Sequence, residues 1–333
     1  TGVNALIDRH NFNFQLILGL PKQLHFGFVF LCASVLTAVL MTIWAAIPED
    51  ILSYSKTSVF GFAVIGILRS FICFLLPLVF LSTRYVVSGK NLMGKFPGIG
   101  ILIISILAGF PASLIFTALH NLSLYFYITN HTRVPLPAIF YAGLDRSPIA
   151  LALILIAGVL LPSIAEGVFF RGLLFASLPK KCQNGFGIII IAFLFAVFML
   201  NPIDFWAYFF LGLLLGYIRM TTDSVISSIL TQCAMVGFML ILSALIPYIG
   251  IAEAQTRIDI DPSIPYVAIT SIVIGLLALG AVVSQLQRNY SGMLLEKSSV
   301  PETDFTDTKW YKGWSIVMSA LFLFSLWSII MFR

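Results

Sequence analysis

The chain alternates between long apolar runs and short polar breaks, and the lengths of the runs predict its architecture. Crossing a hydrocarbon layer takes roughly 17–25 residues of α-helix. Runs of about this order cover residues 26–47, 59–81, 96–119, 149–166, 186–200, 205–218, 225–246, 266–283 and 314–332. The fold class predicted is therefore all-α, a polytopic integral membrane protein with about nine transmembrane helices (a range of about 8–10).

The fifth and sixth runs differ from the others because they are short. Only residues 201–204, Asn-Pro-Ile-Asp, separate them. Two short apolar helices joined by so brief a break predict a tight helical hairpin that need not cross the membrane completely.

Composition agrees with a membrane location and changes how the charge is interpreted. Of 333 residues, 59% are hydrophobic and 10% are charged, whereas soluble domains carry about 25% charged residues. The net charge of +5 would suggest a nucleic-acid partner in a soluble chain. Here Lys and Arg gather in alternate loops, which predicts a cytoplasmic N-terminus, the lipid bilayer as partner and no nucleic acid.

Polar and apolar stretches divide the chain into three predicted parts. Residues 1–147 hold N-terminal transmembrane helices and loops, including a long aromatic loop over residues 120–147. Residues 148–246 are dense in Gly, Phe and intramembrane polar side chains and are predicted to be the core. Residues 247–333 hold C-terminal helices and a polar cytoplasmic loop at residues 284–313.

Glu166 and Arg171 follow an uncharged run that covers residues 148–165. An ionised side chain inside a membrane costs roughly 2.5–3.5 kcal/mol on insertion scales unless it is paired or hydrated. Five residues apart on an α-helix, the two do not form an ideal pair, so each is expected to contact another helix. Arg69, which lies within the second apolar run, is the predicted partner of Glu166. The simplest interpretation is an ion pair that fixes helix register.

The residues around this pair resemble a known family. The segment Glu-Gly-Val-Phe-Phe-Arg at residues 166–171 is similar to the first motif, Glu-Glu-x-x-x-Arg, of the CPBP family. That family comprises CAAX prenyl endopeptidases, bacteriocin-processing proteins and related Abi membrane proteins. Its second motif, Phe-x-x-x-His, aligns with residues 195–199, and its last, His-x-x-x-Asn, with residues 232–236. The resemblance covers about residues 148–240.

The resemblance implies an intramembrane endopeptidase, but most of the implied catalytic groups are replaced. In the family, the first Glu activates a water, histidines position it and the Asn helps to hold the oxyanion. Carried over, Glu166 and Arg171 are retained, whereas the second Glu is Gly167. The His and Asn positions hold the residues Met199, Gln232 and Val236. Asn201, two residues past Met199, and Arg69 are the further polar residues predicted for the cavity.

These replacements favour a pseudoprotease that acts as a membrane scaffold or partner subunit. Losing one catalytic hydrogen-bond donor commonly costs about 10²–10³ in rate, so three altered positions predict little activity. A membrane-protein partner or a hydrophobic or lipidated peptide is the expected ligand, and the bacterial plasma membrane the expected location. No cofactor is predicted. No metal site is predicted either, because Met199 is a poor ligand for a hard ion and the four cysteines form no Cys-x-x-Cys pair.

Two alternatives remain open at this stage. The first is an active glutamate-dependent intramembrane peptidase with an altered site, in which Glu166 is the base and Gln232 donates a hydrogen bond. The second is a transporter or transporter subunit, in which Arg69, Glu166, Arg171 and Gln232 line a solute path.

Overall fold

The computed structural model describes residues 26–45, 59–85, 89–130, 148–178, 185–201, 203–245 and 262–291. Within these ranges the regular structure is helical, apart from a bridge between Gly94 and Ser224. Five helical stretches are long and apolar enough to cross a membrane, and three shorter helices are also apolar. The all-α, multi-pass membrane architecture expected from the sequence is confirmed. The ninth predicted span, residues 314–332, lies outside the described residues.

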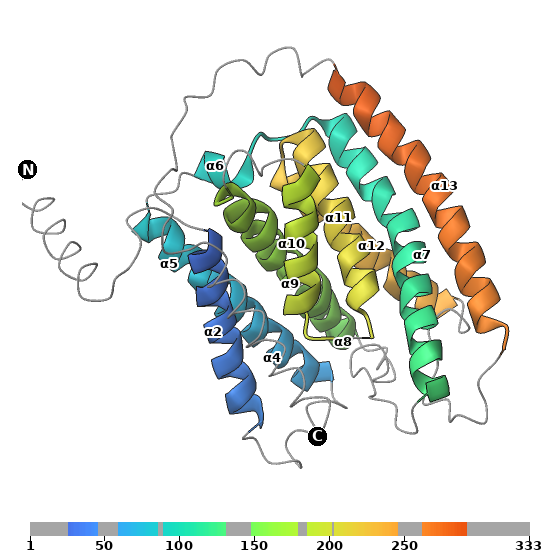
Figure 1. Ribbon diagram of the computed structural model, residues 1–333, viewed down its shortest axis with the longest axis horizontal. Helices are drawn as coiled ribbons and strands as arrows, with labels where there is room; N and C mark the ends of the chain where they lie inside the picture. The colour runs from blue at the N-terminus through green and yellow to red at the C-terminus, as the bar shows by residue number, and fades with distance from the viewer. Residues whose placement is uncertain are drawn as a thin grey trace, which may run out of the picture.

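The helices form one bundle in which helices far apart in the chain also lie side by side (Figure 1). In chain order they are α2 (Phe26–Ala45), α4 (Val59–Arg69), η1 (Ser70–Leu75), α5 (Leu76–Arg84), α6 (Gly89–Met93), α7 (Ile99–Asn130), α8 (Pro148–Leu153), η2 (Ile154–Leu160), α9 (Leu161–Glu166), η3 (Gly167–Leu174), α10 (Gly185–Phe198), α11 (Phe205–Thr222), α12 (Val225–Leu245) and α13 (Ile264–Ser291). The elements named η are π-helical.

Three predicted boundaries were wrong, each because a helix continues past the first polar residues. α7 extends to Asn130 rather than ending before residue 120, and Leu124 in this extension is buried. α13 extends to Ser291, so the predicted polar loop does not begin at residue 284. The fourth run does not end at Glu166 but continues through η3 to Leu174. Packing against neighbouring helices outweighs the local polarity in all three cases.

Short helix α10 and its partner α11 form the predicted hairpin. α10 has 14 residues, about 21 Å of helix, which is less than the roughly 30 Å hydrocarbon core. The two helices approach closely because Gly212 of α11 faces Ala192 of α10. A Cβ atom on Gly212 would lie 2.7 Å from the Cα of Ala192. Small residues of this kind permit close helix packing inside membranes.

π-helical winding interrupts two of the long helices just before a proline. η1 precedes Pro77, and η2 precedes Pro162. Proline has no backbone N–H to donate to the carbonyl four residues earlier, so the regular α-helical hydrogen bonding cannot continue there. A third π segment, η3, follows Glu166 directly. Such segments are rare and often lie at functional sites.

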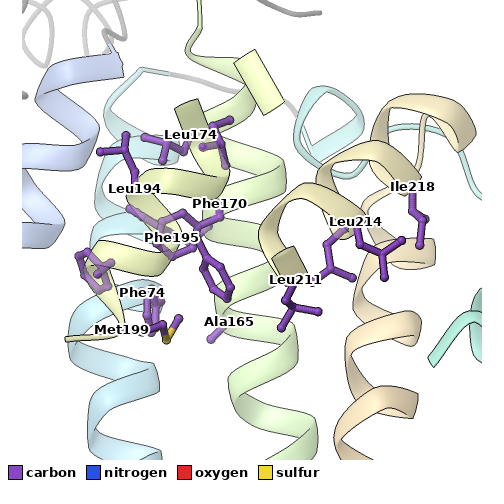
Figure 2. Packing of buried hydrophobic residues seen from close by; sticks show 14 of the residues in the cluster. Phe74, Ala165, Phe170, Leu174, Leu194, Phe195, Met199, Leu211, Leu214 and Ile218 are labelled. Carbon is purple, nitrogen blue, oxygen red and sulfur yellow. The ribbon is translucent and has the colours of Figure 1, made fainter. Parts of the chain in front are cut away.

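Buried aromatic rings fill the space between α4–α5, η3 and α10. The ring of Phe74 lies with its centroid 5.9 Å from that of Phe170 and 5.3 Å from that of Phe198. Phe170 also packs on Phe195, at 5.1 Å. Figure 2 shows Phe74, Phe170 and Phe195 near Met199, and leucines of α11 belong to the same cluster. Edge-to-face contacts between such rings add to the stabilisation from burial alone.

The long helix α7 packs against three other helices, α11, α12 and α13. Its contact with α12 depends on Gly109. A Cβ atom at this position would lie 2.5 Å from the Cβ of Ala234 and 2.7 Å from the backbone nitrogen of Met235. Both distances are shorter than real contacts allow, so the interface has no room for a side chain.

Gly109→Ala is expected to push α7 and α12 apart and to lower the free energy of unfolding in detergent by about 1–3 kcal/mol. The matched control is Gly237→Ala on α12, where an added Cβ meets no atom within 4 Å. Because alanine favours helix over glycine, the control should be neutral or slightly stabilising. Equal effects of the two substitutions would contradict this account of the interface.

Candidate functional site

Glu166 lies at the end of α9, and two other helices supply its partners. The residue is buried, with 7% of its surface exposed. Its Oε1 lies 3.9 Å from Nη2 of Arg69 at the end of α4, the ion pair expected from the sequence. Its Oε2 accepts a 2.8 Å hydrogen bond from the side-chain amide of Gln232 on α12. The carboxylate therefore ties α4, α9 and α12 together.

Arg171 is buried more completely, at 1% exposure. Its Nη1 donates to Oε1 of Gln232 over 3.3 Å, and its guanidinium carbon lies 4.3 Å from the centroid of the Phe195 ring. A cation over an aromatic face is attracted by the negative face of the ring. The Nε and Nη2 groups have no hydrogen-bond partner among the described residues.

Gln232 forms hydrogen bonds with both Glu166 and Arg171. Its amide nitrogen donates to Glu166, and its amide oxygen accepts from Arg171. The expectation that Glu166 and Arg171 each contact other helices is thus confirmed. π-helical winding in η3 helps, because hydrogen bonds from i to i+5 bring residues five apart closer to one face than an α-helix does.

Met199 joins this group through Arg69. The Nη2 of Arg69 lies 2.8 Å from the Met199 sulfur, so one guanidinium contacts both the thioether and the Glu166 carboxylate. Val236 is one turn beyond Gln232 on α12 and packs against the hydrophobic core cluster. Of the residues aligned with the family motifs, Glu166, Arg171, Met199 and Gln232 gather around shared contacts, while Val236 belongs to the adjoining core.

Asn201 was expected to join the Glu166 group, but its side chain bonds to a different residue. Its side-chain nitrogen donates to Oδ2 of Asp204 over 2.6 Å, within the turn that joins α10 to α11. The other carboxylate oxygen of Asp204 contacts Nδ1 of His120, from α7. Sequence reasoning missed this pair because it assigned His120 to a loop. The available signal was an aspartate in the hairpin break together with a histidine at the end of an apolar run.

Tyr208 of α11 interacts electrostatically with both polar groups. Its partners are Asp204 of the turn and Arg69 and Glu166 of the other group. Its ring packs edge-on against Phe116 of α7, with a centroid distance of 5.2 Å, which holds it in place. The Asp204 turn and the Glu166 group are therefore close enough to influence each other.

At the other end of α11, Arg219 lies next to the segment that follows α6 and also contacts the site. Its Nη1 forms a 2.9 Å ion pair with Asp223, and its Nε donates to the backbone oxygen of Arg171 over 3.4 Å. Gly94, at φ 73°, passes so close that a Cβ there would lie 2.1 Å from the Asp223 oxygen. Arg219 is itself buried in the bundle.

No cluster of three or more His, Cys, Asp or Glu side chains that could hold a metal ion occurs in the described part of the chain. Cys32, Cys73 and Cys233 are free thiols. The polar groups that the structure brings together are instead arranged for mutual ion pairing and hydrogen bonding.

Residues 148–238 are similar to a known protein family. The family model described as type II CAAX prenyl endopeptidase Rce1-like matches residues 148–238. This segment is an Rce1-like domain. It is of the CPBP type that the motifs predict, and it contains Glu166, Arg171, Met199, Gln232 and Val236. No curated protein and no solved structure matches the chain.

Gln232→Leu is expected to destabilise the Rce1-like domain because it removes a partner from each of two buried charges. A buried polar group left unpaired costs about 1–3 kcal/mol, so the loss of unfolding free energy should be about 2–4 kcal/mol. The matched control is Gln285→Leu on the exposed face of α13, expected to change stability by less than about 0.5 kcal/mol. Chemical unfolding in detergent compares them, and a Gln232→Leu protein as stable as the control would refute the bridging role.

Proposed function

We propose that this protein is a non-proteolytic pseudoprotease that serves as a membrane scaffold or partner subunit. The observation that supports the proposal most directly is the position of Arg69. Its guanidinium contacts both the Glu166 carboxylate, at 3.9 Å, and the Met199 sulfur, at 2.8 Å. Where the family motif has a histidine, this chain therefore has a thioether in contact with the cation that pairs with Glu166.

The chemistry available around Glu166 supports the same conclusion. Amide hydrolysis needs a base for water, donors for the developing oxyanion and an acid for the leaving amine. Arg69 cannot take up a proton, and the Gln232 amide supplies a hydrogen bond but no acid. The Met199 sulfur offers no proton at all. The group contains a carboxylate and fixed donors, which suits ion pairing better than proton transfer.

A scaffold role fits the contacts made by the residues that stand at the family's catalytic positions. The replacements keep the helices in contact, because Gln232 bridges Glu166 and Arg171 and Met199 packs on Arg69. We take the predicted core, residues 148–246, as the unit that would bind a membrane-protein partner or a hydrophobic or lipidated peptide. The proposal includes a bacterial plasma membrane as the location, which the resemblance favours.

One observation favours a second candidate, an active glutamate-dependent peptidase. Glu166 is retained, and the Gln232 amide lies 2.8 Å from its carboxylate, where it could also donate to a reacting oxygen. A transporter is favoured less, because Arg69, Glu166, Arg171 and Gln232 contact one another.

Cleavage assays on purified protein separate the first two functions. We expect no cleavage of prenylated peptides or of a broad membrane-peptide library, and no difference between the wild type and Glu166→Gln. Glutamine is close to glutamate in shape and lacks only the carboxylate. Glu166→Gln is therefore the matched control for background hydrolysis. Turnover by the wild type that disappears in Glu166→Gln would overturn the pseudoprotease proposal.

Cross-linking in native membranes tests the scaffold role itself. A scaffold should cross-link to the same partner, in the same amount and at full length, in wild-type and Glu166→Gln cells. A protease should instead accumulate uncleaved substrate when Glu166 is replaced. Absence of any specific cross-linked partner in both strains would remove the support for a scaffold.

A further inference from the structure

The π-helical segment η3 returns to ordinary α-helical winding at its C-terminal end, where the helix has one carbonyl more than it has amides. The amide of Phe175 donates to the carbonyl of Phe170, five residues earlier. Two residues further on, the amide of Ser177 donates to the carbonyl of Leu173, four residues earlier. Counting both ends, three amides stand opposite four carbonyls, so the helix alone cannot give each carbonyl its own amide.

The two carbonyls between these acceptors belong to Arg171 and Gly172, and each has a donor outside the regular pattern. The amide of Phe175 is shared, since it also contacts the carbonyl of Gly172. Arg171 has a donor from another helix, because Nε of Arg219 on α11 donates to its carbonyl over 3.4 Å. A buried carbonyl without a donor costs about as much free energy as a lost hydrogen bond, so Arg219 compensates for the change of winding.

Arg219 is held in place by the turn between α11 and α12. Its Nη1 forms a 2.9 Å ion pair with Asp223, whose backbone is left-handed at φ 50°. The carbonyl of Asp223 accepts a 2.8 Å hydrogen bond from the amide of Lys95. Gly94 closes another side, because a Cβ atom there would lie 3.0 Å from Nη1 of Arg219. One nitrogen of the guanidinium therefore contacts the turn, and another contacts η3.

Arginine is the side chain that suits both contacts. A guanidinium is planar and presents its N–H groups in a rigid fork, whereas lysine has one nitrogen on a flexible stem. Arg219→Lys would therefore keep a positive charge beside Asp223 but lose the separate donor to Arg171. Because Arg219 is only 7% exposed, water is poorly placed to take over that bond.

The residue whose carbonyl Arg219 contacts is also the one whose side chain completes the polar site. Arg171 extends its Nη1 to Gln232 over 3.3 Å and places its guanidinium carbon 4.3 Å from the centroid of the Phe195 ring. Each residue of an α-helix turns the chain by about 100°, so a shift in winding at Arg171 would turn its side chain away from both partners.

We propose that Arg219 is a positioning residue of the site. It stabilises the return of η3 from π-helical to α-helical winding and thereby directs the Arg171 guanidinium onto Gln232 and Phe195. The proposal goes beyond the scaffold function and is independent of it, because it concerns where Arg171 points and holds equally for a scaffold and for a peptidase.

NMR of the arginine Nε–H groups in detergent tests this role. The Arg171 signal reports its position because the guanidinium lies over the Phe195 ring, whose ring current shifts nearby protons. With that signal assigned by Arg171→Lys, both Arg219→Ala and Arg219→Lys should remove most of the ring-current shift. Arg288→Lys, at an exposed position on α13, is the matched control and should leave the signal unchanged. An Arg171 signal that stays in place in Arg219→Lys would overturn the proposal.

A double-mutant cycle gives a second readout that a general loss of stability would not change. The effects of residues that act through one network are not additive. The loss of stability caused by Gln232→Leu should therefore be smaller in the Arg219→Lys background than in the wild type, and undiminished in the Arg288→Lys background. An additive cycle between Arg219→Lys and Gln232→Leu would contradict the positioning role.

Hydrogen exchange provides a measurement on the wild-type protein that does not depend on any variant folding. The Nε–H proton of Arg219 should exchange with water far more slowly than that of the exposed Arg288, because it is buried and bonded to the Arg171 carbonyl. Equally rapid exchange of the two protons would refute the proposed contact.

Discussion

Burial of opposite charges in a membrane-spanning bundle is the constraint on which the rest of the structure depends. An ionised group removed from water is costly unless nearby groups of opposite charge and hydrogen-bond partners compensate. Here Glu166 is compensated by Arg69 and Gln232, and Arg171 by Gln232 and the face of Phe195. Each partner comes from a different helix, so compensating the charges also fixes how α4, α9, α10 and α12 are placed.

The need to compensate buried charges also bears on the residues at the family-motif positions. A catalytic carboxylate and a structural one need different neighbours: the first needs groups that exchange protons, the second needs permanent partners. Met199 and Gln232 are of the second kind, since one packs on Arg69 and the other bridges Glu166 and Arg171. Met199 and Gln232 therefore help to keep the helices of the Rce1-like domain in contact around Glu166.

Much of the fold could be predicted from the sequence, because the length of an apolar run is a local property. The Arg69–Glu166 pair was also predictable, since few charges lie within the apolar runs. Three features were not. The π winding of η3 depends on packing, the extension of α7 past His120 depends on contacts with other helices, and the pairing of His120 with Asp204 joins residues far apart in the chain. Asn201 was misassigned for a different reason: its partner Asp204 is local and lies within the same turn.

The π-helical stretch after Glu166 makes the site sensitive to the length of this segment. Its wider turns accommodate what amounts to an extra residue compared with an α-helix, so a deletion of one residue between Gly167 and Arg171 could restore regular α winding. Each residue of an α-helix turns the chain by about 100°, and the side chains that follow would point in new directions. The spacing from the Glu166 carboxylate to the Arg171 guanidinium therefore depends on the length of this segment, whereas the position after Glu166 is occupied by Gly167, which has no side chain.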